Sequence, residues 1–194
     1  ELSYGVMANN YEGSLDARTL IGWFPYPVAA TVRDTTGTSR PDSSLVFVGG
    51  KMVIYVDTVA SVHEGPVDLS IGALTQSWHY ASATWEVAVD TVGDRREWEE
   101  AGAGPVMSLA TATWDPEEAD SVIFELDSAE VAIWNDTASA EQGVRIDAIT
   151  EGVRLQANTF RLHLTTRPSS NPDTLVDLVI QPRWRSFIYQ PVLE

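Results

Sequence analysis

LVFVGGKMVIYV, residues 45–56, is the stretch that decides the fold of this chain. Two apolar runs, residues 45–48 and 52–56, flank the pair Gly49 and Gly50. β-Branched and aromatic residues favour strands, and a glycine pair favours a tight turn or a bulge. The stretch therefore predicts either two strands joined by a turn or one long strand with a glycine bulge.

Outward from this stretch, apolar and polar residues alternate with a period of two in several further runs. The clearest is SVIFELD, residues 121–127, which places Val122, Phe124 and Leu126 on one face. Polar side chains take the alternate positions later in the chain: Arg145, Asp147, Arg154, Gln156, Arg161 and His163. The other alternating runs are residues 67–71, 144–148, 153–157, 159–165 and 174–180. Such alternation is typical of antiparallel strands with one buried face and one solvated face.

Turn-forming sequences separate these runs at residues 35–44, 64–66, 99–105 and 167–173. One segment has helical spacing instead: DSAEVAIWND, residues 127–136, with Asp127 or Ser128 as the N-cap. We therefore predict an all-β chain, an antiparallel, jelly-roll-like β-sandwich with one short helix near residues 127–136. We expect residues 1–194 to form a single domain.

The charge of the chain restricts its partners. The 194 residues carry 12 cations and 28 acids, a formal net charge of −16, and Lys51 is the only lysine. Such a protein repels phosphate backbones, so nucleic acid is not expected as a partner. The longest apolar run, residues 20–32, is too short for a spanning helix and contains two prolines, so we expect no transmembrane span. The chain has no cysteine, which excludes disulfides and thiolate chemistry.

A set of tryptophan-containing motifs occurs in a defined order. A strand leads to SWHYASATW, residues 77–85; then come VIFELD, residues 122–127, the residues Val131 and Trp134, and finally QGV, residues 142–144. Over residues 42–180 this succession resembles the DNRLRE family of bacterial β-sandwich domains. The resemblance implies a jelly-roll sandwich related to growth-factor propeptides. It also implies kinship with carbohydrate-binding modules, some of which bind alginate, and with surface proteins and lipoproteins.

The chain departs from the family pattern at two positions, where Tyr80 replaces an acidic residue and Glu86 replaces an asparagine. In the family, the tryptophans equivalent to Trp78 and Trp85 are framework residues, so we expect a structural role for both. We expect Trp134 to hold the short helix against a sheet. Trp98 and Trp114 lie in polar, Pro- and Gly-rich surroundings. They are the candidates for exposed rings that stack on a glycan.

No catalytic motif is present. The three histidines are scattered, and the chain has neither a metalloprotease motif, a nucleophile elbow nor a Walker loop. We therefore expect no enzymatic activity and no cofactor. Two acidic loops, residues 97–100 and 115–120, are solvated loops or, as the alternative, structural Ca²⁺ sites.

The two ends of the chain are rich in aromatic residues and arginine. The tail, residues 181–194, contains Arg183, Trp184, Arg185, Phe187 and Tyr189, and the N-terminal segment, residues 1–41, contains Trp23, Phe24 and Tyr26. These residue types often anchor protein interfaces, so they are the candidate partner-binding residues. The alternative is that both segments are peripheral elements that cover edges of the sandwich, with the tail as a final strand.

Two functional classes remain. The first is a non-catalytic structural or interaction subunit of a cell-envelope, surface or membrane-associated assembly, docking through these terminal segments. The alternative is a carbohydrate-binding module for a neutral polysaccharide, because an acidic protein repels polyuronates. Either class fits an extracytoplasmic protein (periplasmic, cell-surface or secreted) whose leader has been removed.

Overall fold

The computed structural model describes residues 4–135, 143–180 and 182–189, with side chains for all of these except residues 184–189. The predicted fold class is confirmed: the strands are antiparallel, and α1, Ser128–Ile133, is the one helix in the described part. No helix among the described residues has the length and apolar character needed to cross a membrane.

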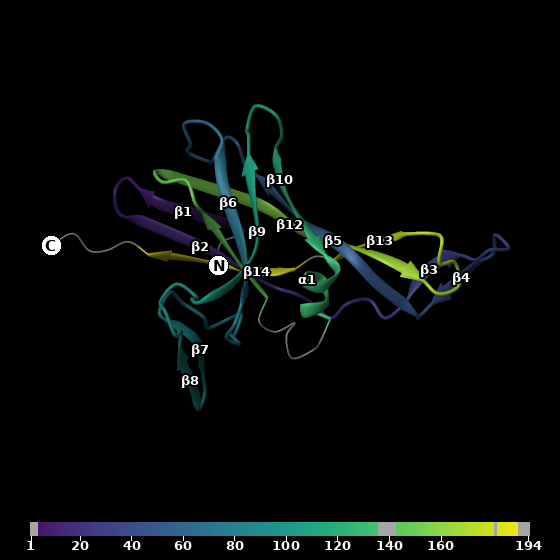
Figure 1. The fold of residues 1–194 in the computed structure, drawn as a ribbon. Coiled ribbons are helices and arrows are strands. Elements are labelled where there is room, and N and C mark those ends of the chain that lie inside the picture. Colours follow the sequence, from purple (N-terminus) through teal and green to yellow (C-terminus); the bar gives the residue numbers. More distant parts are fainter. Residues whose placement is uncertain (1–3, 136–142, 181, 190–194) are drawn as a thin grey trace.

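Most strands belong to one sheet, which curls into a nearly closed sandwich. Its strands follow the order β10-β5-β12-β1-β2-β11-β6-β9, with β13 added to β12 and β14 to β2. Their bounds are β1 Gly5–Tyr11, β2 Leu15–Gly22, β5 Leu45–Val56, β6 Val67–Leu74, β9 Val106–Trp114, β10 Ser121–Asp127, β11 Val144–Ala148, β12 Val153–Pro168, β13 Val176–Ile180 and β14 Arg183–Tyr189. The first and last strands in this order, β10 and β9, are joined by the turn at residues 115–120 (Figure 1).

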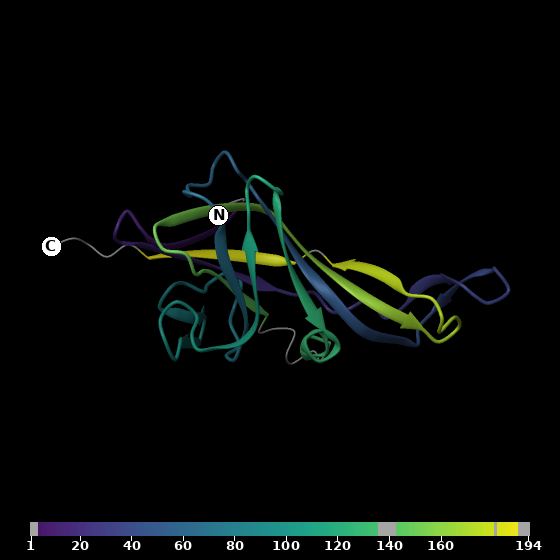
Figure 2. The same cartoon turned by 45° about the horizontal axis from the view of Figure 1, so that its top comes forward.

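Two hairpins extend from this body. One is β3, Ala30–Arg33, with β4, Ser39–Asp42, and the other is β7, Val87–Thr91, with β8, Asp94–Glu97. Figures 1 and 2 show them at separate ends of the molecule, the β3–β4 hairpin beside β13 and the β7–β8 hairpin below β6 and β9. We refer to residues 75–105, which contain β7 and β8, as the appendage.

Residues 45–56 form one long strand, β5, with a bulge next to the pair Gly49 and Gly50, and not two strands joined by a turn. Gly49 lies opposite Thr165 of β12, whereas Phe47 lies opposite Thr166, which leaves Val48 as the extra residue of a bulge. Gly50 packs against the carbonyl oxygen of His163 without room for a Cβ atom.

The short helix begins as the sequence predicts. Asp127 is its N-cap and accepts hydrogen bonds from the amides of Ala129 (2.8 Å) and Glu130 (2.9 Å). The carboxylate of Glu130 in turn accepts from the amide of Asp127 at 2.7 Å, which completes a capping box. The buried side chains of Val131 and Trp134 attach the helix to the hydrophobic core of the sandwich.

The core of the described residues is divided into a large cluster, a small cluster and a third group of Val6, Ala8 and Ala17 from β1 and β2. The large one fills the sandwich and contains alternate residues of β5, β6, β10, β11 and β12, such as Ile54, Phe124 and Phe160. The small one lies under the appendage and is built around Leu20, Trp78 and Trp98. β2 therefore contributes to all three, since Ile21 belongs to the large cluster and Ala17 to the third group.

The expectation that residues 1–41 are peripheral is wrong for their first half. β1 and β2 are central strands: β1 pairs with β12 and β2, and β2 pairs with β11. The tail forms a final strand, the second alternative, because residues 183–189 are β14 and pair with β2.

Candidate functional site

A polar hollow of about 310 Å³ lies over β1, β2, β6 and β11. It is lined by Ala8, Asn9, Asp16, Arg18, Ser70, Arg145, Asp147 and Ala148. The charged side chains come from outward-facing positions of β2 and β11, two neighbouring strands of the sheet. The hollow therefore gathers hydrogen-bond donors and acceptors on the solvated face of the sandwich.

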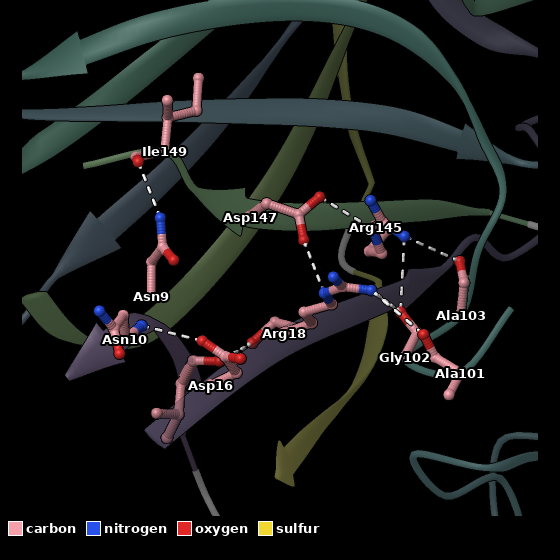
Figure 3. Close-up of polar contacts among 12 residues, drawn as sticks. Asn9, Asn10, Asp16, Arg18, Ala101, Gly102, Ala103, Arg145, Asp147 and Ile149 are labelled. Carbon is pink, nitrogen blue, oxygen red and sulfur yellow. Dashed lines mark hydrogen bonds and ion pairs between the residues drawn. The ribbon is translucent and has the colours of Figure 1, made fainter. Parts of the chain in front are cut away.

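Asp147 is the centre of this group (Figure 3). One of its carboxylate oxygens lies 3.2 Å from Nε of Arg18, and the other accepts from Nε of Arg145 at 2.8 Å. Burial and the neighbouring guanidinium of Arg145 lower the pKa of Arg18, whereas Asp147 opposes that shift. The carboxylate of Asp147 therefore bridges the guanidinium groups of Arg18 and Arg145.

The two arginines also hold the appendage against the sheet. Nη1 of Arg18 donates to the carbonyl of Gly102 at 2.6 Å, and Nη1 of Arg145 donates to that of Ala103 at 3.2 Å. The guanidinium of Arg18 lies 5.0 Å from the ring centroid of Trp85, whose carbonyl accepts from the amide of Gly102. Gly102 has a φ of +78°, and a Cβ atom there would meet Arg18 and Trp85.

A second cluster combines aromatic rings with an arginine, and we call it the aromatic–arginine cluster: Phe24, Tyr80 and Arg183. The guanidinium of Arg183, at the start of β14, lies 4.8 Å from the ring centroid of Phe24 and 5.7 Å from that of Tyr80. Phe24 is 46% exposed and Arg183 is exposed, while Tyr80 is half-buried. Both terminal segments therefore meet at one surface site, together with a residue of the appendage.

The other predicted partner-binding residues have different outcomes. Trp23 and Tyr26 are buried in the large core, where the rings of Trp23 and Trp134 lie 5.5 Å apart and Tyr26 donates to the carbonyl of Val131. An exposed docking role for these two is therefore wrong. Trp184, Arg185, Phe187 and Tyr189 lie in β14, but their side chains are outside the described part of the chain.

The expected exposure of Trp98 and Trp114 is also wrong. Their side chains are 6% and 0% exposed, and each indole N–H is satisfied inside the protein. Trp98 donates to the carbonyl of Thr84 at 2.9 Å, and Trp114 donates to that of Ala119 at 3.0 Å. Neither ring is therefore accessible to a glycan. Trp78 and Trp134 are buried as predicted.

The acidic loops and the histidines form no metal-binding group in the described residues, where no three His, Asp or Glu side chains lie together suitably. Asp115 caps its own loop by accepting from the amide of Glu117 at 2.9 Å. His79 contacts Ser82, and His163 contacts Asp177 at 2.8 Å. The third histidine, His63, packs against Trp114, so the three do not converge.

The sequence predicts Phe24 and Arg183 of the aromatic–arginine cluster, but it does not group the charged residues of the polar hollow, although these had a signal. Asp16 and Arg18 are two apart on one strand and Arg145 and Asp147 are two apart on another, so each pair shares a face. Which strands are neighbours cannot be deduced from that spacing. Tyr80 was noted only as a departure from the family pattern.

Comparisons of the chain with protein-family models, curated proteins and solved structures return no match. The resemblance to DNRLRE domains therefore stays a prediction.

Proposed function

We propose that the protein is a non-catalytic interaction subunit that docks through the aromatic–arginine cluster onto an extracytoplasmic assembly at the cell envelope or surface. The observation that carries this proposal is the position of Arg183, between the rings of Phe24 and Tyr80 at the surface. Arginine and tyrosine are the residues that most often dominate the binding energy of protein interfaces.

The cluster is already ordered for binding. Pro25 follows Phe24 and restricts it to an extended backbone. Stacking on two rings keeps the guanidinium plane fixed, and such contacts at exposed sites contribute about 0.5–1 kcal/mol. No carboxylate among the described side chains lies within 4 Å of Arg183, so its charge has no ionic partner among them.

The carboxyl groups with clear pKa shifts do not have the raised pKa values of a general acid. The carboxyl pKa values that shift clearly, those of Asp34, Asp42 and Asp57, all move down. A general acid at neutral pH needs the opposite shift. The carboxylate nearest the centre of the hollow, Asp147, is neutralised by two arginines.

The test is capture from an extract of the organism's own cell envelope on the immobilised full-length chain. The variant Phe24→Ser with Arg183→Glu removes the ring and reverses the charge of the cluster. Val28→Ser with Arg33→Glu is the matched control, because both side chains are exposed and lie outside the cluster. We expect a partner that the wild type and the control retain and the cluster variant loses at least about tenfold, equivalent to about 1.4 kcal/mol. Equal capture by the cluster variant would disprove docking at this cluster.

A second candidate is binding of a neutral glycan in the polar hollow. The hollow has room for a single sugar unit and presents the planar, hydrogen-bonding side chains of Asn9, Asp16 and Arg145. A glycan array with the wild type and Asp16→Ala separates this candidate from the first. Specific binding that Asp16→Ala abolishes favours it, and the absence of binding to every neutral glycan removes it.

A further inference from the structure

The outer face of β10, β5, β12 and β13 differs in charge from the rest of the molecule. Where β12 pairs with β5, three cations lie on this face, Lys51, Arg161 and Arg167, together with three acids, Glu125, Asp127 and Asp177. This face is therefore neutral, and the whole formal charge of −16 belongs to the remaining residues. We call Lys51, Arg161 and Arg167 the basic stripe.

The cations of the stripe have no ionic partner in the described residues, whereas two of the three acids are engaged. Asp127 caps α1, and Asp177 contacts His163. None of the three cations has a carboxylate oxygen within 4 Å among the described side chains. Arg161 instead lies over the ring of Tyr55, 5.3 Å from its centroid. Arg161 is thus held on this face, and the three cations lack an ionic partner among the described side chains.

Exposed apolar side chains lie among these cations. Ile123 of β10, Val179 of β13 and Val46 of β5 are all exposed, although they lie within regular strands. In the register of the sheet, Val53 lies between Ile123 on one neighbouring strand and Arg161 on the other. His163 likewise lies between Val179 and Lys51. Exposed aliphatic residues interleaved with tyrosine and arginine have the composition of an interface.

The same chain carries an acidic counterpart, the turn at residues 115–120. Its sequence, DPEEAD, has four acids and no cation, and Glu117, Glu118 and Asp120 are exposed. No cation lies within 4 Å of these three carboxylates in the described residues. Figure 1 shows the turn at the top of the molecule, where β9 passes into β10, so it projects away from the body.

We propose that the acidic turn of one copy docks on the basic stripe of a second copy. This proposal does not depend on the aromatic–arginine cluster, because the two surfaces share no residue. Such a contact joins two different surfaces, so it is either made twice in a two-fold dimer or repeated along a chain or around a ring. A turn of six residues buries little area, which places the contact in the weak, transient class.

The net negative charge of the protein opposes this association by long-range repulsion, and the ionic strength determines how strongly that repulsion is screened. At about 0.15 M ionic strength the Debye length is about 8 Å, so charges far from the contact are screened while touching charges still attract. We therefore expect association near physiological ionic strength and its loss at about 1 M salt, where the Debye length is about 3 Å.

The test is sedimentation of the full-length chain over a range of concentrations, with variants that exchange the charges. The stripe variant is Lys51→Glu with Arg161→Glu, and the turn variant is Glu117→Lys with Glu118→Lys. We expect the wild type to associate as its concentration rises and each variant alone to associate at least about tenfold more weakly. An equimolar mixture of the two variants should associate again, because the reversed turn then meets the reversed stripe.

The matched control is Arg95→Glu with Arg96→Glu on β8, which changes the net charge as much as the stripe variant does but lies outside the face. This control should associate like the wild type. A wild type that stays monomeric at all concentrations, a control that loses association equally, or a mixture that fails to recover would each overturn the proposal. Circular dichroism of each variant confirms that the substitutions, all at partly or fully exposed positions, leave the fold intact.

Discussion

The sheet body and the two hairpins of this protein are held together in different ways. The body buries alternate residues of long strands in one large apolar core, whereas the appendage has a small core and the hydrogen bonds of Arg18 and Arg145. The β3–β4 hairpin is attached by the buried carboxylate of Asp42, by the hydrogen bond from Asn171 to the carbonyl of Arg33 and by the buried Ala30 and Val32. Burial of apolar area is non-directional and is spread over many residues, whereas the appendage and the hairpin are attached by a few directional polar contacts. The candidate sites lie where these two kinds of structure meet.

The largest effect is expected in the body, from two neighbouring residues of β10 that face opposite ways. Phe124→Ala creates a cavity in the large core and should lower the free energy of unfolding by about 3–5 kcal/mol. Ile123→Ala, on the outer face, should lower it by less than about 1 kcal/mol. Denaturant unfolding of both variants measures the difference. Similar losses would contradict a body stabilised by one-sided burial.

The second effect concerns the appendage. Gly102→Ala combines a strained left-handed conformation with a Cβ atom that meets Arg18 and Trp85. Overpacking of this kind adds about 1–3 kcal/mol to the strain itself. Gly93→Ala is the control, because its φ is +82° but nothing lies within 4 Å of the added atom. Amide hydrogen exchange should show faster opening of the appendage in Gly102→Ala, with the amides of β5 and β12 little changed. Equal effects of the two variants would mean that the arginines do not hold the appendage.

The third effect is the loss of the shared carboxylate. Asp147→Asn removes the charge that separates the guanidinium groups of Arg18 and Arg145, and should destabilise the protein by about 1–2 kcal/mol. Asp94→Asn breaks the exposed ion pair with Arg96, at 3.2 Å, and should cost less than about 0.5 kcal/mol. Thermal unfolding in low and high salt compares the two. A loss in Asp147→Asn no larger than that in Asp94→Asn would contradict a structural role for the hollow.

The same contrast explains which elements could be predicted from the sequence. β5, β10 and β12 are covered by the large core on one face only, so their apolar residues alternate. β2 is covered on both faces, with Leu20 under the appendage and Ile21 in the large core, and the alternation disappears. That double coverage is a tertiary property, so the central position of β1 and β2 could not be deduced from local pattern.

The tryptophans illustrate the same limit. Trp98 and Trp114 stand in polar sequence, but their indole N–H groups find carbonyls of the neighbouring loops and their rings are buried. Polar neighbours along the chain therefore say little about burial when the chain turns sharply. The short helix was predictable because its signal, the capping box of Asp127 and Glu130, is local.

The smallest effect is expected at the β3–β4 hairpin and depends on pH. The carboxylate of Asp42 accepts from the hydroxyl and amide of Ser170, at 2.6 and 2.7 Å, and from the amide of Ser44 at 2.7 Å. Hydrogen bonds from Ser170 above all lower the pKa of Asp42 from its ordinary value of 3.8 to about 2. Because the folded pKa is the lower one, the stabilising contribution is complete above pH 3.8 and is lost as the pH falls towards 2.

Asp42→Asn tests this dependence directly. The variant is less stable than the wild type near neutral pH, and its stability should fall less steeply between about pH 4 and pH 2 because one titrating group is gone. Asp16→Asn is the comparison, because its carboxylate accepts one backbone amide hydrogen bond, from Asn10, and it lies in the body. Denaturant midpoints measured at several pH values give the slopes. An equal slope in Asp42→Asn and the wild type would mean that the hydrogen bonds from the surrounding serines do not lower the pKa of Asp42. The hairpin would then be attached to the body by other contacts.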